Sequence, residues 1–315
     1  MNKVQISLTC KHLQRDANEY RAALESHGFD VHVPAIPGQQ LDGDALVAAM
    51  QGIAGVIAGD DGFTADVLAQ LPDLKVIAKW GIGLDGIDLP AAAERGIIVT
   101  NTPGMFNDEV AEMALGYLIA LVRGIVDTDR SIRTGDWPNP VGRSLAALRV
   151  GVVGLGNIGL EFAQKASLLG MPVVGFDPGQ AAQSNATAAG IAHADLDSLT
   201  SSSDIVVLTC PLNDATRGLF DAARISSMPT GSYLINVGRG PVVHTSAVAD
   251  ALNRGHLAGA ALDVFDEEPL PADSPIRTSP NCIFGSHNSS NTFEACHRTH
   301  KAAIDNLVAG LAGSS

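Results

Sequence analysis

Short apolar runs alternate with amphipathic stretches along the whole chain. Apolar runs bounded by turn residues predict buried strands, and apolar residues spaced three and four positions apart predict helices. In the first hundred residues the predicted strands are Val4–Leu8, Val31–Val33, Ala54–Ala58, Leu74–Ala78 and Ile97–Thr100. Because helical stretches separate these strands, we expect a parallel sheet that is covered by helices on both faces.

A second series of apolar runs follows later in the chain. Its predicted strands are Val150–Val153, Val173–Phe176, Ile205–Thr209, Tyr233–Asn236, Ala258–Val264 and Ile283–Gly285. Six is the number of strands in a complete dinucleotide-binding sheet. Helices over Gly159–Leu169 and Ser246–Arg254 fit between the strands, whereas the segment Thr134–Val141, which carries a glycine and two prolines, is predicted to be irregular.

Two further helices indicate how the two series are joined. A long apolar helix is expected over Val110–Val122, with Asn107 as its N-cap and two acidic residues in its first turn. Asn291, with Glu294 three residues later, resembles a capping box at the start of a last helix. That helix is long enough to return to the first sheet, so we expect the second domain to be inserted within the first. The predicted domains are 1–101 plus 289–315, and 102–288.

Composition narrows the classes of function. The chain has 315 residues, of which 46% are apolar and 17% charged, and its formal net charge is −14. This charge argues against nucleic acid or an anionic membrane as the main partner. The four cysteines form no C-x-x-C pair and no zinc spacing, so we expect reduced, buried thiols.

Membrane, export and metal signals are weak. No apolar stretch is long and uncharged enough to span a bilayer, and the N-terminus lacks the pattern of a signal peptide, so a cytoplasmic protein is expected. His297 and His300 have the spacing of a metal pair on the last helix. Because no third ligand is near in sequence, we expect a solvated helix face and predict no metal site.

A glycine motif follows the first strand of the second series. Gly154, Gly156 and Gly159 form G-x-G-x-x-G between a strand and a helix, which suits a tight turn, close approach of a pyrophosphate and close helix–strand packing. The helix that opens at Asn157 and Ile158 would direct its first amides toward the phosphates.

The next strand ends at Asp177, about twenty residues after the motif, where an acid can bind the ribose hydroxyls of the adenosine. No Arg or Lys lies close behind it to bind a 2′-phosphate. The motif therefore predicts binding of NAD in preference to NADP.

Three ionisable residues follow the last three predicted strands: Arg239, Glu268 and His287. Alone, each would be an ordinary loop residue. Because ligands of open α/β sheets bind at the carboxyl ends of the strands, all three are expected beside the cofactor. An Arg can bind a carboxylate through two hydrogen bonds, and a His beside a Glu can act as a general acid and base.

With these motifs in order, nearly the whole chain resembles the D-isomer-specific 2-hydroxyacid dehydrogenase family. Besides the glycine motif, the matching segments are Val76–Leu89, Asn101–Met105, Val110–Met113, Pro211–Arg217, Asn236–Pro241, Leu262–Leu270 and Ser286–His287. The resemblance implies a Rossmann NAD domain inserted into a flavodoxin-like substrate domain, and a homodimer that forms through the NAD domains.

The resemblance also implies residue roles. Arg239 would bind the substrate carboxylate and carbonyl, Glu268 would pair with His287, and His287 would exchange a proton with the substrate oxygen. Residues expected to contact NAD, besides the glycine motif and Asp177, are Pro211, Thr216, Val237 and Asp263. Residues expected to contact the anionic end of the substrate are Lys79, Trp80, Gly81, Ile82 and Gly83.

The sequence leaves the substrate open. Phe106 stands where the family usually has Asn, and Asn288 begins a polar stretch where the family usually has small apolar residues. The segments Lys79-Trp-Gly and Asn107-Asp-Glu-Val resemble those of short phosphoglycerate dehydrogenases, and Lys79 favours a phosphate on the substrate. The first expectation is therefore a short D-3-phosphoglycerate dehydrogenase. The alternatives are a hydroxypyruvate or glyoxylate reductase, and a non-catalytic protein that senses NAD(H) on the same fold.

Overall fold

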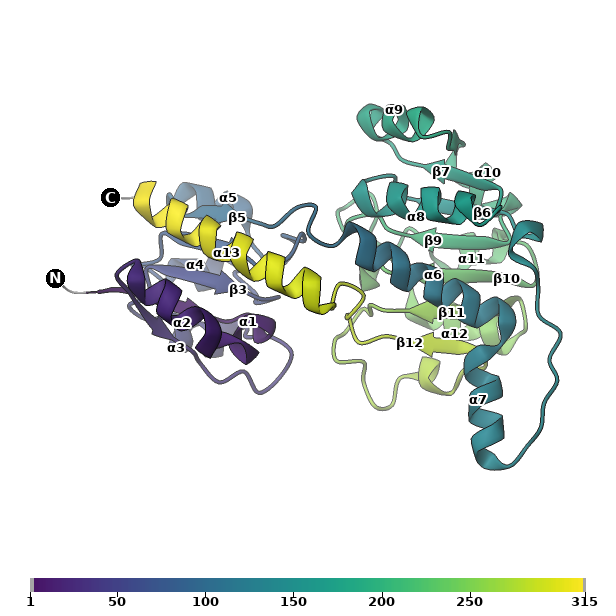
Figure 1. Ribbon diagram of the computed structural model, residues 1–315, viewed down its shortest axis with the longest axis horizontal. Coiled ribbons are helices and arrows are strands. Elements are labelled where there is room, and N and C mark those ends of the chain that lie inside the picture. Colours follow the sequence, from purple (N-terminus) through teal and green to yellow (C-terminus); the bar gives the residue numbers. More distant parts are fainter. Residues whose placement is uncertain (1–2, 314–315) are drawn as a thin grey trace. The chain divides into compact units, whose positions relative to one another are not determined.

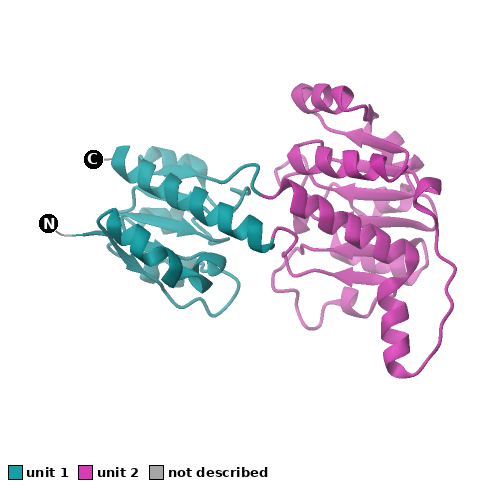
Figure 2. Cartoon of the chain, viewed as in Figure 1, with its two compact units in different colours: residues 1–105, 291–315 teal, residues 106–290 magenta. Residues whose placement is uncertain are grey.

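The computed structural model describes residues 3–313, and the chain divides into two compact units (Figures 1 and 2). The described parts of Met1–Met105 and Asn291–Ser315 form unit 1, and Phe106–Ser290 forms unit 2. The boundaries lie a few residues later in the chain than those expected from the sequence.

Unit 1 contains a parallel sheet of five strands. The strands are β1 (Val4–Leu8), β2 (Phe29–His32), β3 (Gly55–Ala58), β4 (Val76–Lys79) and β5 (Ile98–Thr100). Their order is β2-β1-β3-β4-β5, and all four pairings are parallel. This is the strand order of flavodoxin-like folds.

Helices cover both faces of this sheet (Figure 1). They are α1 (Lys11–Arg15), α2 (Ala17–Ser26), α3 (Gly43–Met50), α4 (Ala65–Ala69), α5 (Leu89–Glu94) and α13 (Phe293–Gly313). Helices α3, α4 and α5 share one hydrophobic core with the sheet. The last helix, α13, packs on β3 and β4, and Gly310 allows the close contact because a Cβ there would lie 2.9 Å from Val76.

Unit 2 contains a parallel sheet of seven strands. They are β6 (Val150–Val153), β7 (Val173–Phe176), β8 (Ala192–His193), β9 (Ile205–Leu208), β10 (Ser232–Asn236), β11 (Leu257–Leu262) and β12 (Cys282–Phe284). Their order is β12-β11-β10-β9-β6-β7-β8, which is the doubly wound dinucleotide-binding order with one added edge strand. The sequence missed β8 because its two residues are exposed and too short to form an apolar run.

The helices of unit 2 also form two layers. They are α6 (Asn107–Arg123), α7 (Ile125–Thr134), α8 (Asn157–Leu168), α9 (Gln180–Ala188), α10 (Leu196–Ser202), α11 (Ala222–Ser227) and α12 (Thr245–Asn253). Short 3-10 turns occur at Leu145–Ala147, Gly240–Val242 and Pro275–Thr278. Helices α6 and α8 pack against each other, and α11 and α12 do the same. The predicted fold class, two doubly wound parallel-sheet domains, is confirmed.

The helices depart from the sequence predictions in three places, two of them at helix starts. Phe106, not Asn107, occupies the N-cap of α6, because this aromatic residue is buried at the start of the helix. At the start of α13 the Thr292 hydroxyl accepts a hydrogen bond from the Ala295 amide at 3.1 Å. The sequence had assigned this capping role to Asn291. Helix α7 was not expected, and none of its residues is buried within the chain.

Among the described residues, no helix combines the length and apolarity needed to cross a membrane.

Candidate active site

The glycine motif forms the turn between β6 and α8. Gly154 has a φ of 97°, in the left-handed region that favours glycine. At Gly159 a Cβ would collide with the Gly154 carbonyl and lie 2.6 Å from the Thr209 hydroxyl. At Gly156 a Cβ would meet no atom within 4 Å, and no side chain caps α8. The first amides of α8 therefore face open space, which suits a dinucleotide pyrophosphate.

Asp177 links two loops at this end of the sheet. Its Oδ2 accepts a hydrogen bond from the Leu155 amide, and its Oδ1 accepts one from the Gly179 amide, both at 2.8 Å. The acid predicted for the ribose thus also holds the glycine turn in place. Its carboxylate lies at the carboxyl end of β7, next to β6 in the sheet.

The Pro211–Thr216 loop closes on itself after β9. The Thr216 hydroxyl donates to the Pro211 carbonyl at 2.7 Å and accepts from the Asn213 amide at 2.9 Å. Two residues predicted to border NAD are therefore held together by the fold, and the Thr216 side chain shapes the loop from within.

Asn236 holds the loop that carries Arg239. This side chain is 1% exposed; it accepts from the Gly238 amide at 3.1 Å and donates to the Arg239 carbonyl at 3.0 Å. The Arg239 guanidinium donates to the Gly238 carbonyl at 3.0 Å and remains partly exposed. Asn236 was not singled out from the sequence, although it ends a predicted strand at this edge.

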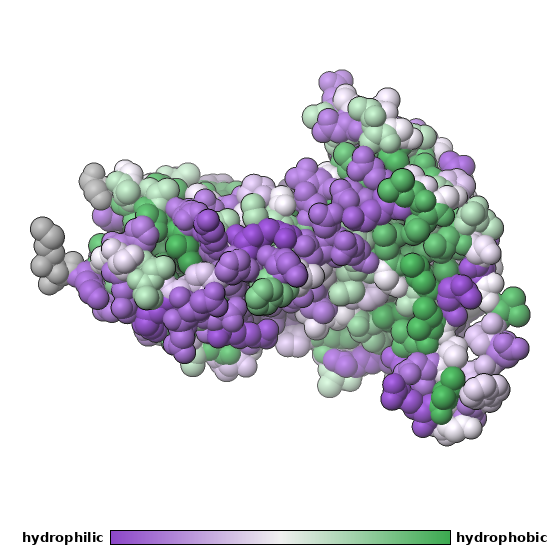
Figure 3. Space-filling view, in the orientation of Figure 1, coloured by the Kyte–Doolittle hydropathy of each residue, from purple (hydrophilic) through white to green (hydrophobic). Residues whose placement is uncertain are grey.

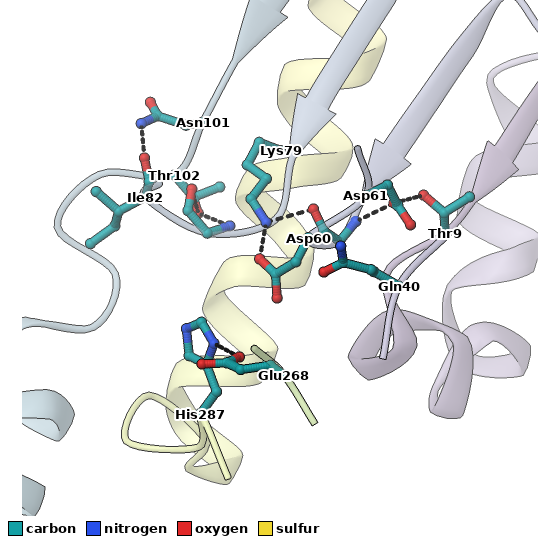
Figure 4. Close-up of polar contacts among 12 residues, drawn as sticks. Thr9, Gln40, Asp60, Asp61, Lys79, Ile82, Asn101, Thr102, Glu268 and His287 are labelled. Atoms are coloured by element: carbon teal, nitrogen blue, oxygen red, sulfur yellow. Dashed lines mark hydrogen bonds and ion pairs between the residues drawn. The ribbon is translucent and has the colours of Figure 1, made fainter. Parts of the chain in front are cut away.

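Glu268 and His287 are in direct contact (Figure 4). Glu268 Oε2 lies 2.7 Å from His287 Nδ1, and its Oε1 accepts from the Phe265 amide at 2.9 Å. The predicted pairing is therefore present in the structure. Because a carboxylate accepts only, it holds a proton on Nδ1, and Nε2 is the ring nitrogen turned away from Glu268.

The turn at His287 is held by Asp263. Its carboxylate is 1% exposed; it accepts from the Tyr117 hydroxyl at 3.2 Å and from the Asn288 and Ser289 amides at 3.3 and 3.0 Å. His287 has a φ of 56°, which is uncommon for a residue with a side chain. A non-glycine residue in this conformation persists only when its surroundings hold it there. Tyr117, which the sequence did not indicate, is thus part of the support for His287.

Burial and the neighbouring Asp263 raise the pKa of Tyr117 well above its usual value, with burial the larger cause. The phenol stays protonated at neutral pH and acts as a hydrogen-bond donor to Asp263.

In unit 1 the loop after β4 carries the residues predicted to bind the substrate. Lys79 Nζ donates to the Gly59 carbonyl at 2.5 Å and to Asp60 Oδ1 at 2.6 Å (Figure 4). The Lys79 side chain is 8% exposed. Its charge is therefore already paired inside unit 1.

Two residues after β5 hold the same loop. The Gly81 amide donates to the Thr102 hydroxyl at 3.0 Å, and Asn101 Nδ2 donates to the Ile82 carbonyl at 2.7 Å (Figure 4). Gly81 has a φ of 131°, which only glycine adopts readily. The loop is thus built to present its backbone in one fixed conformation.

A buried carboxylate joins the neighbouring loops of unit 1. Asp61, which is 1% exposed, accepts from the Thr9 hydroxyl and from the Leu41 and Gly59 amides. Burial raises the pKa of Asp61 above its usual value, against the opposing effect of these donors. Neither Asp60 nor Asp61 was singled out from the sequence.

The cysteines take no part in these sites. All four are free, and Cys10, Cys210 and Cys282 are buried. Burial raises the pKa of the Cys10 and Cys282 thiols to about 12 and that of Cys210 to about 11. These thiols are therefore protonated and poorly nucleophilic at neutral pH.

A glycine turn with open space at the helix end, and an Arg, a Glu and a His following three adjacent strands of the same sheet, are features of a dinucleotide-dependent dehydrogenase. A family model described as "D-isomer specific 2-hydroxyacid dehydrogenase, NAD binding domain" matches residues 115–289. The chain belongs to this family and is an NAD-dependent dehydrogenase.

The chain is also similar to individual proteins that are named as 2-hydroxyacid dehydrogenases or 2-oxo acid reductases. The chain is 40% identical over 259 residues to a glyoxylate reductase of Thermofilum pendens, covering 80% of this chain and 76% of that protein. It is 33% identical over 306 residues to glyoxylate/hydroxypyruvate reductase B of Pectobacterium carotovorum, covering 94% and 92% of the two chains. A crystal structure of Aquifex aeolicus D-lactate dehydrogenase with NAD and lactic acid matches with a TM-score of 0.85 at 26% identity, covering 98% and 96%.

These findings confirm the predicted family, enzyme class and cofactor. For the substrate they favour the sequence-based alternative, because the similar proteins named above include a glyoxylate reductase and a glyoxylate/hydroxypyruvate reductase. The first expectation, D-3-phosphoglycerate dehydrogenase, is not supported by them.

Proposed function

We propose that this enzyme reduces a small 2-oxo acid that has no charge at its far end, such as glyoxylate or hydroxypyruvate, to the 2-hydroxy acid. The observation that carries the proposal is the Lys79–Asp60 ion pair of 2.6 Å. In the sequence, Lys79 favoured a phosphorylated substrate. In the structure its ammonium is buried and paired with Asp60, so it offers little net charge to a phosphate. The names of the similar reductases support the same substrate class.

We propose that His287 is the acid that completes the reduction. When bound, NADH supplies the hydride for the substrate carbonyl carbon, and the carbonyl oxygen then needs a proton. His287 Nε2 would give that proton, because Nδ1 is turned to Glu268 at 2.7 Å. Glu268 keeps the ring oriented and favours its charged form.

Arg239 is the proposed ligand of the substrate carboxylate. Its guanidinium can form two parallel hydrogen bonds with a carboxylate, and Asn236 fixes the backbone on both sides of it. The loop Trp80–Gly83 is the proposed second contact. Its backbone conformation is fixed by the hydrogen bond from the Gly81 amide to the Thr102 hydroxyl and by the one from Asn101 Nδ2 to the Ile82 carbonyl.

Cofactor contacts are proposed at the carboxyl edge of the sheet in unit 2. The amides of Asn157 and Ile158 at the start of α8 would bind the pyrophosphate, and Asp177 the adenosine ribose. Pro211 and Thr216 would border the adenosine end, and Val237 and Asp263 the nicotinamide.

A panel of 2-oxo acids tests the substrate proposal. Glyoxylate, hydroxypyruvate, pyruvate and 3-phosphohydroxypyruvate are each offered with NADH, and oxidation of NADH is followed. We expect glyoxylate or hydroxypyruvate to give the highest kcat/KM. A higher kcat/KM for 3-phosphohydroxypyruvate would overturn the proposal.

The Asp60→Asn variant tests whether the Lys79–Asp60 ion pair sets the preference for an uncharged substrate end. Removing the partner charge leaves Lys79 with a net positive charge, so the ratio of kcat/KM for 3-phosphohydroxypyruvate to that for hydroxypyruvate should rise about fivefold, the factor for about 1 kcal/mol. Asp73→Asn, which removes an exposed charge from the same unit, is the matched control. An unchanged ratio in Asp60→Asn would show that the ion pair does not set the preference.

We also propose that the enzyme is a homodimer formed through unit 2. Figure 3 shows apolar residues gathered on the face of unit 2 that α6 and α8 form. Helix α7 adds exposed Ile125 and Ile132, and the segment after it adds Trp137 and Val141, which are 86% and 99% exposed. Contiguous exposed apolar side chains mark an interface more often than a free surface.

Sedimentation velocity tests the dimer. The wild-type chain should sediment as a dimer, and a Trp137→Lys, Val141→Asp double variant as a monomer with an unchanged circular dichroism spectrum. Leu89→Ser changes an exposed apolar residue of unit 1 and should remain dimeric. A monomeric wild-type chain would refute the proposed interface.

A further inference from the structure

Two histidines of unit 1, His12 and His300, contact Trp80, and neither belongs to the proposed proton-transfer pair. His300 lies on α13, His12 on α1, and His297 one turn before His300. The sequence led us to expect a solvated helix face for His297 and His300, and that is wrong for His300, which is 1% exposed. Trp80 is 6% exposed.

The hydrogen bonds of His300 determine its protonation. Trp80 Nε1 lies 2.8 Å from His300 Nδ1, and an indole N–H can only donate. Nδ1 must therefore be an acceptor and carries no proton. Nε2 then carries the proton and donates to Asp16 Oδ2 at 3.1 Å. The ring is neutral in this arrangement, and its tautomer is set by Trp80.

The loop that begins with Trp80 is tied to α13 at two points. Its first side chain is held by His300. Its third residue, Ile82, is held by Asn101 at 2.7 Å, and Asn306 of α13 donates to the Asn101 carbonyl at 2.9 Å. Helix α13 therefore contacts this loop through one direct and one relayed hydrogen bond.

We propose that His300 is a positioning residue for the loop Trp80–Gly83, which it holds through the Trp80 indole only while its ring is neutral. The inference rests on the proposed role of this loop in binding the substrate. A proton on Nδ1 would set two N–H donors against each other, so the hydrogen bond would be lost. The backbone amides that follow Trp80 would then lose their fixed position, and binding of the substrate would weaken.

Several groups face the His300 ring and act on its charge. Asp16 and Glu19 favour the charged form, whereas His297 on the same helix opposes it, and His12 stacks on Trp80 with ring centroids 4.8 Å apart. The Tyr20 ring meets the His300 ring edge-on at 5.2 Å. Burial is the largest influence, so the pKa of His300 is lowered from its usual value of 6.5.

The direction of the pH effect follows from this. At pH values above the His300 pKa the ring is neutral and the loop is held. As the pH falls below 6.5 toward the lowered pKa, the charged form accumulates and KM for the 2-oxo acid should rise. The chemical step belongs to His287, so kcat at saturating substrate should not follow this titration of His300.

Tryptophan fluorescence offers a test that does not depend on turnover. The chain has two tryptophans, so Trp137→Phe leaves Trp80 as the sole emitter, and a charged imidazole beside an indole quenches its emission. In this parent we expect a step in emission as the pH falls from 8 to 4.5. His300→Gln should remove the part of the step that His300 contributes, because the glutamine oxygen can still accept from Trp80 and does not titrate.

His12 also contacts Trp80 and also has a pKa lowered by burial, so its own protonation can quench the indole. The comparison is therefore made with His12→Gln present. The step should persist in His12→Gln and disappear in the His12→Gln, His300→Gln double variant. A step that disappears in His12→Gln alone, or persists in the double variant, would overturn the assignment to His300.

Kinetics then test the link to the substrate. KM for glyoxylate should rise several-fold at low pH in the parent and change less in His300→Gln. His300→Leu, which cannot accept from Trp80, should raise KM about fivefold at every pH, the effect of one hydrogen bond of about 1 kcal/mol. KM profiles that are the same in parent and His300→Gln would refute the positioning role.

The two proposals fail in different ways. If none of the 2-oxo acids is turned over, the proposed substrate is wrong, and the fluorescence step still decides whether His300 holds Trp80. If turnover is normal and the step is absent, the substrate proposal stands and the positioning role of His300 is wrong.

Discussion

Units 1 and 2 each use a buried carboxylate to organise the carboxyl edge of a parallel sheet, but the charges beside it differ. In unit 2 Asp263 receives a hydroxyl and two amides and supports His287, whose pair with Glu268 is partly exposed. In unit 1 Asp61 likewise receives a hydroxyl and two amides. The neighbouring charged residue in unit 1, Lys79, forms an ion pair with Asp60. A carboxylate of the same kind therefore supports the proposed proton donor in unit 2 and joins neighbouring loops in unit 1.

The first βα turns of the two units differ as well. After β6 the chain turns through Gly154 and leaves open space at Gly156. After β1 it turns through Thr9, whose hydroxyl is bound to Asp61, and Cys10, which is buried. The turn between the first strand and the next helix therefore leaves room for a phosphate in unit 2, whereas side chains fill the corresponding turn in unit 1. Turn chemistry, not the fold class, decides which sheet binds the dinucleotide.

At the edge of unit 2, the largest effect on turnover is expected from removing His287, the proposed proton donor. His287→Gln should lower turnover by about 10²–10⁴-fold, the usual contribution of a general acid, and leave NADH binding unchanged. Steady-state kinetics and NADH fluorescence titration measure the two quantities. His27→Gln, at an exposed position of unit 1, is the control. Turnover near that of the wild type would remove His287 from the mechanism.

Loss of Arg239, the proposed ligand of the substrate carboxylate, should have the next largest effect. Arg239→Gln should lower kcat/KM by about 10–10²-fold, because a hydrogen bond to a charged group contributes about 1.5–3 kcal/mol. Arg254→Gln changes an exposed arginine of α12's C-terminal end and should have no effect. If kcat/KM is unchanged in Arg239→Gln, the carboxylate is bound elsewhere.

The open turn of unit 2 can be filled without disturbing the fold. An alanine at position 156 would meet no atom of the protein within 4 Å, so Gly156→Ala should fold normally. Its Cβ would occupy space needed by the pyrophosphate, and the Kd for NADH should rise about tenfold, or about 1.4 kcal/mol. Gly38→Ala, where a Cβ would make only an ordinary contact of 3.9 Å with the Gln40 carbonyl, is the control. An unchanged Kd would place the pyrophosphate away from this turn.

The smallest expected effects compare the two buried carboxylates directly. Tyr117→Phe removes a donor from Asp263 and should lower kcat about fivefold, because His287 is less firmly held. Thr9→Val removes a donor from Asp61 and should lower the free energy of unfolding by about 1–3 kcal/mol with kcat retained. Urea denaturation and steady-state kinetics are measured for both variants. The reverse pattern would mean that Asp61, and not Asp263, supports catalysis.

Much of the site could be predicted because its signals are local in sequence. The glycine spacing, Asp177, and the positions of Arg239, Glu268 and His287 after their strands all follow from short patterns. Tyr117, Asn236 and Asp61 were missed, because each acts through a partner on another element and has no sequence pattern of its own. Residue 107 was misplaced as a helix cap since the burial of Phe106 sets where α6 begins.

The sequence by itself determined the family, the two parallel-sheet domains and the cofactor, because strand patterns and the glycine turn are properties of short, contiguous segments. Only the tertiary structure decided that Lys79 is paired with Asp60 and that His300 is buried against Trp80. Pairing of charges and burial depend on residues far apart in the chain. A lysine that indicates phosphate in the sequence is therefore an internal ion pair in the fold, and a histidine expected in solvent becomes a support for the proposed substrate loop.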